Sequence, residues 1–320
     1  MAAAILFGCL GCSARGAQNF VRAIPGTEQV AVKQFSISVS PDERWLAFTE
    51  WVLPKSRVFE DLPRYEYEVR IATLNLETNR LIRHGIGSIP ASALGFAPGD
   101  SFWKGQAGLE IIEQRFRPPG WRESVFYFQP YSHGTHVALD ARTPGMQVTA
   151  APAVPLTCSD CPSTTSVQFR DRSWDLLSDD VSVVVNEGMV EAVYYVASPF
   201  QPQDDHRTVY RVTQDTGEVV VVEVPDRRGV VVVINAVRVS PRGRYLAYVR
   251  HSKVRHLFGG VRQELLIRDL STQRELEVAT YGFMSNLIWS PNSERLYFAG
   301  GEYETDSAVR VVDVAAAFAP

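Results

Sequence analysis

Ser40-Pro41-Asp42-Glu43-Arg44-Trp45-Leu46-Ala47-Phe48 is one of three related stretches in this chain. The other two are Ser240-Pro241-Arg242-Gly243-Arg244-Tyr245-Leu246-Ala247-Tyr248 and Ser290-Pro291-Asn292-Ser293-Glu294-Arg295-Leu296-Tyr297-Phe298. Each follows a short apolar run, at 35–39, 236–239 and 287–289. A strand, a Ser-Pro turn and a second strand, recurring at intervals of tens of residues, are typical of a repeat architecture built from small antiparallel sheets.

Further strands follow the first two copies. The pattern predicts strands at 67–74 and 81–84 after the first copy and at 264–268 and 275–280 after the second, with turns at 75–79 and 269–273. Each repeat unit therefore has four strands, which we call A to D in chain order. The A–B turn carries the Ser-Pro stretch, and strands C and D form a hairpin.

The rest of the chain carries more degenerate units. One unit is expected at 181–185, 191–197, 208–213 and 218–224. Another lies within 93–149: it begins with a worn copy of the Ser-Pro stretch at 93–100 and continues with strands at 124–128, 136–140 and 146–149. The stretch 103–121 holds either an additional strand or an insertion, and a further sheet hidden within 103–130 would raise the count from five to six. The last unit has only three strands, at 286–289, 295–299 and 308–314.

A strand at Gln29–Gln34 precedes the first unit and belongs to none. Because unpaired sheet edges favour aggregation, we expect this N-terminal strand to complete the last sheet and close a ring. The sequence thus predicts an all-β fold, a β-propeller of five to six four-stranded blades. Residues 19–320 form a single propeller domain in this interpretation, and residues 1–18 form a separate segment.

The repeat Ser-Pro-Asp/Asn-x-x-x-Leu-Ala-Phe resembles that of the TolB-like, WD-repeat-like propellers and of the propeller domain in prolyl oligopeptidase-type peptidases. The resemblance covers roughly residues 28–316. It implies a structural role for the repeat, with the proline setting the turn and Leu46 and Phe48 packing between sheets. It also implies a role in assembly or maintenance of the bacterial envelope. The chain departs from the family in two ways: it has no room for a hydrolase domain and no separate N-terminal domain of the TolB kind.

The N-terminal segment is almost wholly small and apolar up to Cys12. Its two cysteines, Cys9 and Cys12, each end a stretch that resembles a bacterial lipoprotein signal, so either is a candidate for lipidation. No Lys or Arg precedes the apolar run, which is also short for a signal; a misplaced start codon would account for both departures, and a plain apolar N-terminus is the alternative. We expect a lipid-anchored protein of the bacterial periplasm or outer membrane, in contact with the membrane only through that lipid.

Outside that segment the chain has two cysteines, Cys158 and Cys161. A zinc site would need the second C-x-x-C pair, which lies in the N-terminal segment. A redox-active pair would favour a helix N-terminus, whereas Pro152, Pro155 and Pro162 favour a loop. We therefore predict a local disulfide, and neither a metal site nor a cofactor.

Composition narrows the classes of partner. The chain has 320 residues, of which 45% are hydrophobic and 21% charged, as in ordinary globular domains. The net charge of −4 provides no overall field that would attract nucleic acid. No apolar run approaches the roughly 18–20 residues of a transmembrane helix. A monomeric protein without nucleic-acid partners is expected.

In a propeller the A–B and C–D turns lie on one face and the B–C and D–A loops on the other. The A–B turns here are tight, whereas the B–C loops at 51–65, 198–206, 251–263 and 300–306 are long. Loops on a rigid scaffold commonly carry binding function, and aromatic and Arg residues are enriched at interface hot spots. The candidate binding residues are Trp51, Arg57, Arg64, Tyr65, Asp204, Asp205, His206, His251, Arg255, His256 and Tyr303.

The sequence leads to two alternative predictions of function. The first is a non-enzymatic envelope protein that binds a protein, peptide or glycan through its B–C loops. The alternative is a propeller hydrolase or lyase with its site at the mouth of the central channel. No catalytic residue is assigned: a G-x-S-x-G nucleophile motif is missing, and His133 and His136 with Asp204–His206 form only a weak metal pattern. A pair of glycosidase carboxylates is neither indicated nor excluded.

Overall fold

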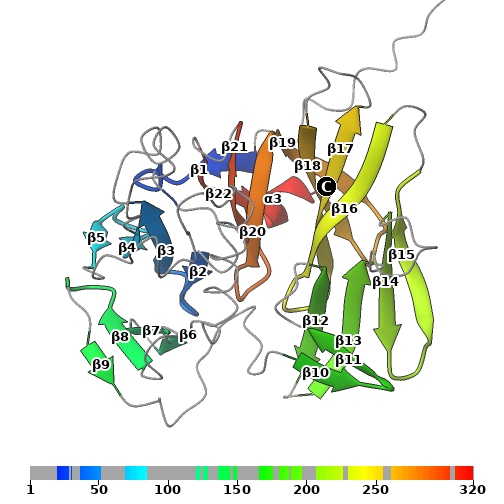
Figure 1. The fold of residues 1–320 in the computed structure, drawn as a ribbon, viewed down its shortest axis with the longest axis horizontal. Helices are drawn as coiled ribbons and strands as arrows, with labels where there is room; N and C mark the ends of the chain where they lie inside the picture. Colours follow the sequence, from blue (N-terminus) through cyan, green and yellow to red (C-terminus); the bar gives the residue numbers. More distant parts are fainter. Residues whose placement is uncertain are drawn as a thin grey trace, which may run out of the picture.

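The computed structural model describes residues 20–28, 30, 37–51, 69–84, 120–122, 125–128, 136–144, 147–149, 166–175, 180–186, 189–196, 207–225, 230–254, 261–302 and 307–319. These residues form five four-stranded antiparallel sheets and one two-stranded sheet, with a single turn of helix, α3 (Val314–Ala317). The all-β class predicted from the sequence is confirmed, and the series of four-stranded sheets is consistent with a propeller (Figure 1).

Four of the sheets run through consecutive strands of the chain. The first sheet contains β2 (Ile37–Val39), β3 (Trp45–Trp51), β4 (Val69–Asn75) and β5 (Leu81–Arg83). The second contains β6 (Gly120–Arg122), β7 (Val125–Phe128), β8 (His136–Asp140) and β9 (Gln147–Thr149). The third contains β12 (Val181–Asn186), β13 (Met189–Val196), β14 (Thr208–Thr213) and β15 (Glu218–Glu223). The fourth contains β16 (Val230–Val239), β17 (Tyr245–Val254), β18 (Val261–Asp269) and β19 (Glu275–Tyr281).

The fifth sheet joins the two ends of the chain. Its strands are β20 (Phe283–Trp289), β21 (Arg295–Gly301), β22 (Ala308–Asp313) and, as the fourth strand, β1 (Val21–Ala23). An N-terminal strand therefore completes the last sheet, but the prediction that Gln29–Gln34 supplies it is wrong. The chain turns after β1 at Gly26, with φ +85°, and Val30 then forms a bridge to Glu50 of the first sheet.

The Ser-Pro stretches form the A–B turns of three sheets, and their geometry explains the repeat. In the first, Ser40 Oγ accepts a hydrogen bond from Trp45 N at 2.9 Å and donates to Asp42 Oδ1 at 2.6 Å. The fourth residue of each copy has a left-handed backbone, with φ of 56° at Glu43, 69° at Gly243 and 65° at Ser293. The serine thus holds the start of the second strand against the end of the first, which is a structural role.

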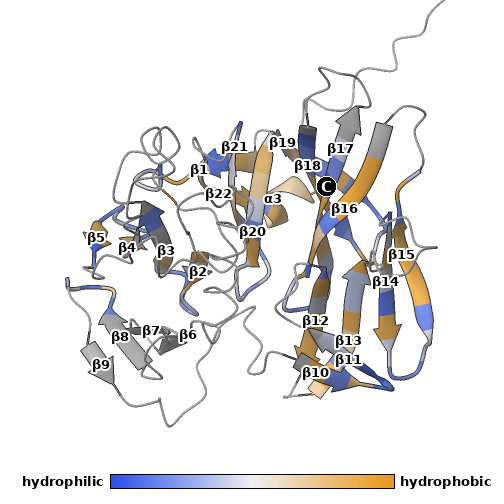
Figure 2. Ribbon diagram, viewed as in Figure 1, coloured by the Kyte–Doolittle hydropathy of each residue, from blue (hydrophilic) through white to orange (hydrophobic). Residues whose placement is uncertain are grey.

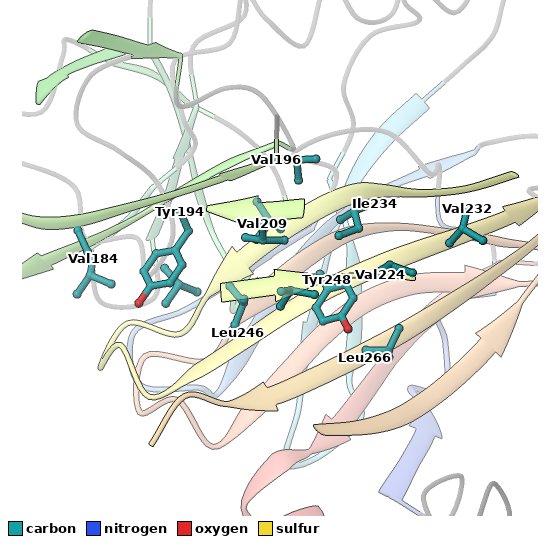
Figure 3. Close-up of a cluster of buried hydrophobic side chains, with 14 residues drawn as sticks. Val184, Tyr194, Val196, Val209, Val224, Val232, Ile234, Leu246, Tyr248 and Leu266 are labelled. Atoms are coloured by element: carbon teal, nitrogen blue, oxygen red, sulfur yellow. The ribbon is translucent and has the colours of Figure 1, made fainter. Parts of the chain in front are cut away.

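Hydrophobic clusters join neighbouring sheets. Buried side chains of the third and fourth sheets pack together around Tyr194, Leu246 and Tyr248 (Figure 3). A second cluster joins the fourth and fifth sheets around Trp289, and a third joins the fifth and first around Phe48. The first strands of these sheets also contact one another, β12 with β16, β16 with β20 and β20 with β2. The Thr73 hydroxyl donates to Ala141 O at 3.2 Å and so connects the first sheet to the second.

The two-stranded sheet was not predicted. It pairs β10 (Ser166–Phe169) with β11 (Arg172–Asp175). Its apolar side chains, Phe169 and Trp174, are buried against the third sheet, on the face turned away from the fourth. The predicted worn copy at 93–100 lies outside the described residues, and the first described strand of the second sheet is β6 instead.

Candidate functional site

Among the predicted site residues, the structure describes the side chain of His251. Trp51 ends β3, where its backbone pairs with Val69. The other candidates lie outside the described residues: Arg57, Arg64, Tyr65, Asp204, Asp205, His206, Arg255, His256 and Tyr303. The same holds for Cys9, Cys12, Cys158 and Cys161, so lipidation and the disulfide stay predictions. The site is therefore built from His251 outward.

His251 lies near the B–C end of the fourth sheet. The loop predicted at 251–263 is shorter than expected, because β17 runs to Val254 and β18 begins at Val261, so His251 lies within a strand. The ten-residue strand β17 carries it beyond the hydrophobic core, whose last members on this strand are Tyr248 and Val249. In the register of the sheet, His251 lies between Val233 of β16 and Gln263 of β18. Alternation along β17 turns its odd-numbered residues toward the fifth sheet, because Val249 packs in that cluster. The long strand thus presents a half-buried imidazole at the rim of the sheet.

Asn235 fixes the orientation of the imidazole. The register of β16 against β17 shifts between Ile234 and Ala236, which leaves Asn235 as the extra residue of a β-bulge. Its amide nitrogen lies 2.8 Å from His251 Nδ1. An amide nitrogen can only donate, so Nδ1 accepts, and in the neutral ring the proton lies on Nε2. Nε2 is then the donor nitrogen of His251, and it is buried within the protein.

The neighbouring strand end carries an ion-pair cluster on the opposite face of the sheet. Arg250 Nε lies 2.5 Å from Glu264 Oε2, and Arg250 Nη2 lies 3.6 Å from Glu277 Oε2. Both Arg250 and Glu264 are largely buried, with side chains 15% and 18% exposed. Burial alone would lower the pKa of Arg250, but the hydrogen bond from Arg250 to Glu264 and the charge of Glu264 raise it. The opposite charges of this cluster compensate one another, and the ion pairs hold the strand ends beside His251 together.

The fourth and fifth sheets meet at the same end of the molecule. Gln263 Oε1 accepts a hydrogen bond from Met284 N at the start of β20. Gly282, between β19 and β20, lies directly against Glu302, since an added Cβ would be 2.0 Å from Glu302 O. Glu302 begins the connection from β21 to β22, which is one of the predicted binding loops. The rim residues of the two sheets are therefore held close together.

Sequence reasoning missed Asn235, Arg250 and Glu264. Arg250 and Glu264 are direct cross-strand partners, which the predicted strand boundaries could have revealed because a pair of opposite charges then faces across β17 and β18. Asn235 could not have been found that way, because it becomes a partner of His251 only through the bulge.

The opposite ends of the sheets are occupied by structural contacts. Arg242 N donates to Ser293 Oγ at 3.1 Å, and Arg295 pairs with Glu43 at 3.2 Å, so neighbouring Ser-Pro turns are tied to one another. The C–D turn of the fourth sheet is held by Asp269, which accepts from Ser271 and from Arg244. These polar groups are already paired within the protein.

Comparisons with known proteins identify no family. No family model and no curated protein matches the chain. Within the described residues, no helix is long and apolar enough to cross a membrane.

Several solved structures share a distant likeness. An oligogalacturonate lyase from Vibrio parahaemolyticus is 11% identical over 87% of this chain, with a TM-score of 0.29. A putative 6-phosphogluconolactonase from Bacteroides fragilis is 12% identical over 82% of this chain and 76% of its own, with a TM-score of 0.29. An endo-arabinase from Bacteroides thetaiotaomicron is 8% identical over 89% of this chain and 97% of its own, with a TM-score of 0.31.

The chain spans only 64% and 65% of the length of two oligogalacturonate lyases, the Vibrio protein and one in complex with manganese. With TM-scores near 0.3 and identities near 10%, none of these likenesses bears on what this chain binds or catalyses.

Proposed function

We propose that this chain is a non-enzymatic β-propeller that binds a protein, peptide or glycan through the B–C ends of its blades. The observation that carries the proposal is the contrast between the two ends of the sheets. Short A–B and C–D turns are tied to one another at one end, as Arg242 is to Ser293. At the other end, strand pairs such as β3–β4 and β13–β14 are joined by longer connections. Polar residues that the fold does not use are expected there.

The geometry at His251 differs from that of a catalytic base in a triad. A histidine that acts as a general base in a triad donates from Nδ1 and keeps Nε2 unprotonated. Here Nδ1 accepts from Asn235, which leaves the opposite tautomer. His251 Nε2 is itself buried, so His251 contributes to this end of the sheet through its contact with Asn235.

The proposed propeller has six blades. In addition to the five four-stranded sheets, β10 and β11 form the outer hairpin of a further blade, which lies between the second and third sheets along the chain. Arg170, in the turn of this hairpin, donates to Gln214 O in the C–D turn of the third sheet at 2.6 Å. Adjacent C–D turns are expected to meet in this way in a propeller. Only residues 176–179 separate β11 from β12, too few for two more strands, so the hairpin would be the C–D pair of its blade. In this proposal β1 closes the ring.

The proposed location is the bacterial envelope, with the protein held by a lipid on Cys9 or Cys12. The experiment is membrane fractionation of cells that express the chain and its Cys9→Ser/Cys12→Ser variant. The variant should move from the membrane to the soluble fraction. Unchanged membrane association would refute the lipid anchor but would not bear on the binding proposal.

Affinity capture from an envelope extract tests the binding proposal. The bait is compared with a variant that combines Arg57→Ala, His251→Ala and Tyr303→Ala, and with Arg242→Ala, a control on the opposite face. Partners recovered by the wild type and the control but lost with the triple variant would support binding through the B–C ends. Equal recovery by all three proteins would overturn it.

The alternative is a hydrolase or lyase with its site at the mouth of the central channel. Turnover of a panel of glycans and lactones tests it on the same proteins. Turnover that His251→Ala abolishes, while His251→Ala leaves the unfolding midpoint unchanged, would establish the enzyme and replace the binding proposal.

A further inference from the structure

The outer strand of the third sheet, β15, has an unusual exposed edge. It contains four consecutive valines between Glu218 and Glu223. Val219 and Val220 are 41% and 51% exposed. No strand in the described part of the chain pairs with the outer side of β15, which lies at the right-hand edge of the molecule in Figure 1. Figure 2 shows the apolar character of this strand at the periphery.

Other described outer strands are protected in the usual ways. The strand β5 is three residues long and exposes Arg83. The strand β19 is longer, but its most exposed positions, Glu275 and Glu277, carry charges. Short length and charged residues are common devices that prevent an edge from pairing with another chain. The strand β15 is six residues long, and the centre of its edge carries two exposed valines and no charge.

A β-bulge brings the two flanking glutamates onto one face. The register between β14 and β15 shifts between Val209 and Tyr210, so that Glu223 lies opposite Thr208, Val220 opposite Tyr210 and Glu218 opposite Val212. Thr208, Tyr210 and Val212 alternate along β14 and point to the same face. The edge therefore presents a carboxylate, an exposed valine and a second carboxylate in one row, with the ring of Tyr210 beside the valine.

The two carboxylates differ in their partners. Glu218 accepts from Tyr195 and lies 3.2 Å from Arg172, although its side chain is still 40% exposed. Glu223 is exposed and makes no ion pair with any described residue. We propose that this edge binds an extended basic peptide, which joins the third sheet as a fifth strand.

The charges argue for a basic peptide and against a second copy of this chain. If β15 paired antiparallel with itself about the centre of the four valines, Glu218 would face Glu223 of the other copy at both ends. Like charges directly opposite one another destabilise a strand pair, whereas opposite charges stabilise it. Lys or Arg opposite each glutamate meets this requirement, with an apolar residue over Val220.

The register also defines the spacing of the peptide. Glu218 and Glu223 are five positions apart, but their partners Thr208 and Val212 on the unbulged β14 are four apart. An incoming strand without a bulge covers the same length in four residues. The peptide therefore has the pattern basic, any, apolar, any, basic.

The test is fluorescence polarisation with a labelled nonapeptide whose core is Lys-Thr-Val-Thr-Lys. A control peptide has the same composition with its two lysines adjacent. We expect the first peptide to bind about tenfold more tightly than the control, because only it places both lysines opposite carboxylates. Val220→Lys should weaken binding by about tenfold or more through loss of apolar contact and like-charge repulsion.

Two matched variants give the test its specificity. Val185, on β12 of the same sheet, is as exposed as Val220, so Val185→Lys adds the same charge away from the edge and should leave binding unchanged. Glu223→Lys should weaken binding of the basic peptide, and replacing the facing peptide lysine by glutamate should restore it. When the peptide is added, hydrogen exchange should become slower at those amides in residues 218–223 that point away from β14.

Three results would overturn the inference. One is peptide affinity that Val185→Lys and Val220→Lys reduce equally, since binding would then follow overall charge. Another is strong exchange protection, without peptide, of those amides in residues 218–223 that point away from β14, since another part of the chain would then cover the edge. The last is a wild-type dimer that Val220→Lys converts to a monomer, since a second copy would then be the occupant. His251→Ala should not change peptide binding at β15. Failure of the peptide-binding inference can therefore be told apart from failure of the proposed function.

Discussion

Single residues in the turns define how each repeat unit folds. The fourth residue of a Ser-Pro turn must adopt a left-handed backbone, and the three copies meet this need with Glu43, Gly243 and Ser293. A side chain in that conformation costs roughly 1–2 kcal/mol, except for glycine. Glu43 and Ser293 instead offset part of the cost through contacts with neighbouring turns, Glu43 with Arg295 and Ser293 with Arg242.

Gly243→Ala should therefore destabilise the protein by about 1 kcal/mol. The cost is conformational, because an added Cβ would meet only Val184 side-chain atoms at an ordinary distance of 3.6 Å. Urea unfolding provides the measurement. Gly217→Ala is the matched control, because nothing lies within 4 Å of its added Cβ and its backbone is not left-handed. Equal midpoints for the two variants would contradict the strain argument.

Asp269 should make stability depend on acid pH. Its burial by itself would raise the carboxyl pKa, but hydrogen bonds from Ser271, Arg244 and Thr272 prevail and lower the pKa to about 2. A folded pKa below the unfolded value stabilises the protein above about pH 4, and the stabilisation is lost as the pH falls toward 2. The full effect is about 2 kcal/mol.

Asp269→Asn should remove that dependence. The variant should be less stable than the wild type by about 2 kcal/mol at pH 7, and the difference should shrink between pH 4 and pH 2. Urea midpoints measured at half-unit pH intervals provide the comparison. A difference that stays constant down to pH 2 would show that the carboxyl does not titrate in this range.

At the scale of elements, strand ends and the bends between them position the candidate site. The long strand β17 carries His251 past the core, and the bulge in β16 brings Asn235 to it. The bend between β19 and β20 then brings the rim of the fifth sheet against that of the fourth. Gly282 allows this approach because its missing side chain leaves room for the backbone of Glu302.

Gly282→Ala should separate these two rims. The added Cβ would lie 2.0 Å from Glu302 O, so the backbone must move, and we expect a loss of about 1–3 kcal/mol in unfolding free energy. Hydrogen exchange should also become faster at the start of β20 and the end of β21. A variant with wild-type stability and exchange would show that the approach of Gly282 to Glu302 is dispensable.

At the scale of the whole molecule, the last sheet depends on both ends of the chain. The strand β1 pairs with β22, and Ile24 N then donates to Val309 O at 2.8 Å. The buried Thr27 hydroxyl adds a contact with this segment, since Val309 N donates to Thr27 Oγ1 at 3.0 Å. These contacts cover an edge of β22 that would otherwise be exposed.

Removal of residues 1–23 should therefore destabilise the protein by about 2–4 kcal/mol, from lost hydrogen bonds and lost burial of Val21. It should also promote aggregation, because β22 becomes an open edge. Removal of residues 1–18 is the control, since it leaves β1 intact and should preserve the unfolding midpoint. Similar behaviour of the two truncated proteins would show that β1 contributes little to the last sheet.

Much of the fold could be predicted because its signals are local. The turn serines have their hydrogen-bond partners close by in the sequence: Ser240, for example, accepts from Tyr245, five positions away. The turn and the strands on either side of it can therefore be predicted from the sequence. The same is true of the C–D turn at Asp269, which pairs with Ser271 and Thr272. For the site, the sequence predicted His251 in a loop at 251–263, whereas it lies within β17, which runs to Val254 before β18 begins at Val261.

Long-range contacts decided the rest. The three-residue strand β1 was missed because so short a segment is stable only when paired with β22, almost the whole chain length away. The hairpin β10–β11 was missed because its apolar side chains find their partners on the third sheet rather than in a recurring turn. Asn235 became a partner of His251 only through a bulge. Local chemistry thus specified the repeating unit, whereas packing between distant segments selected the strands and side chains that complete it.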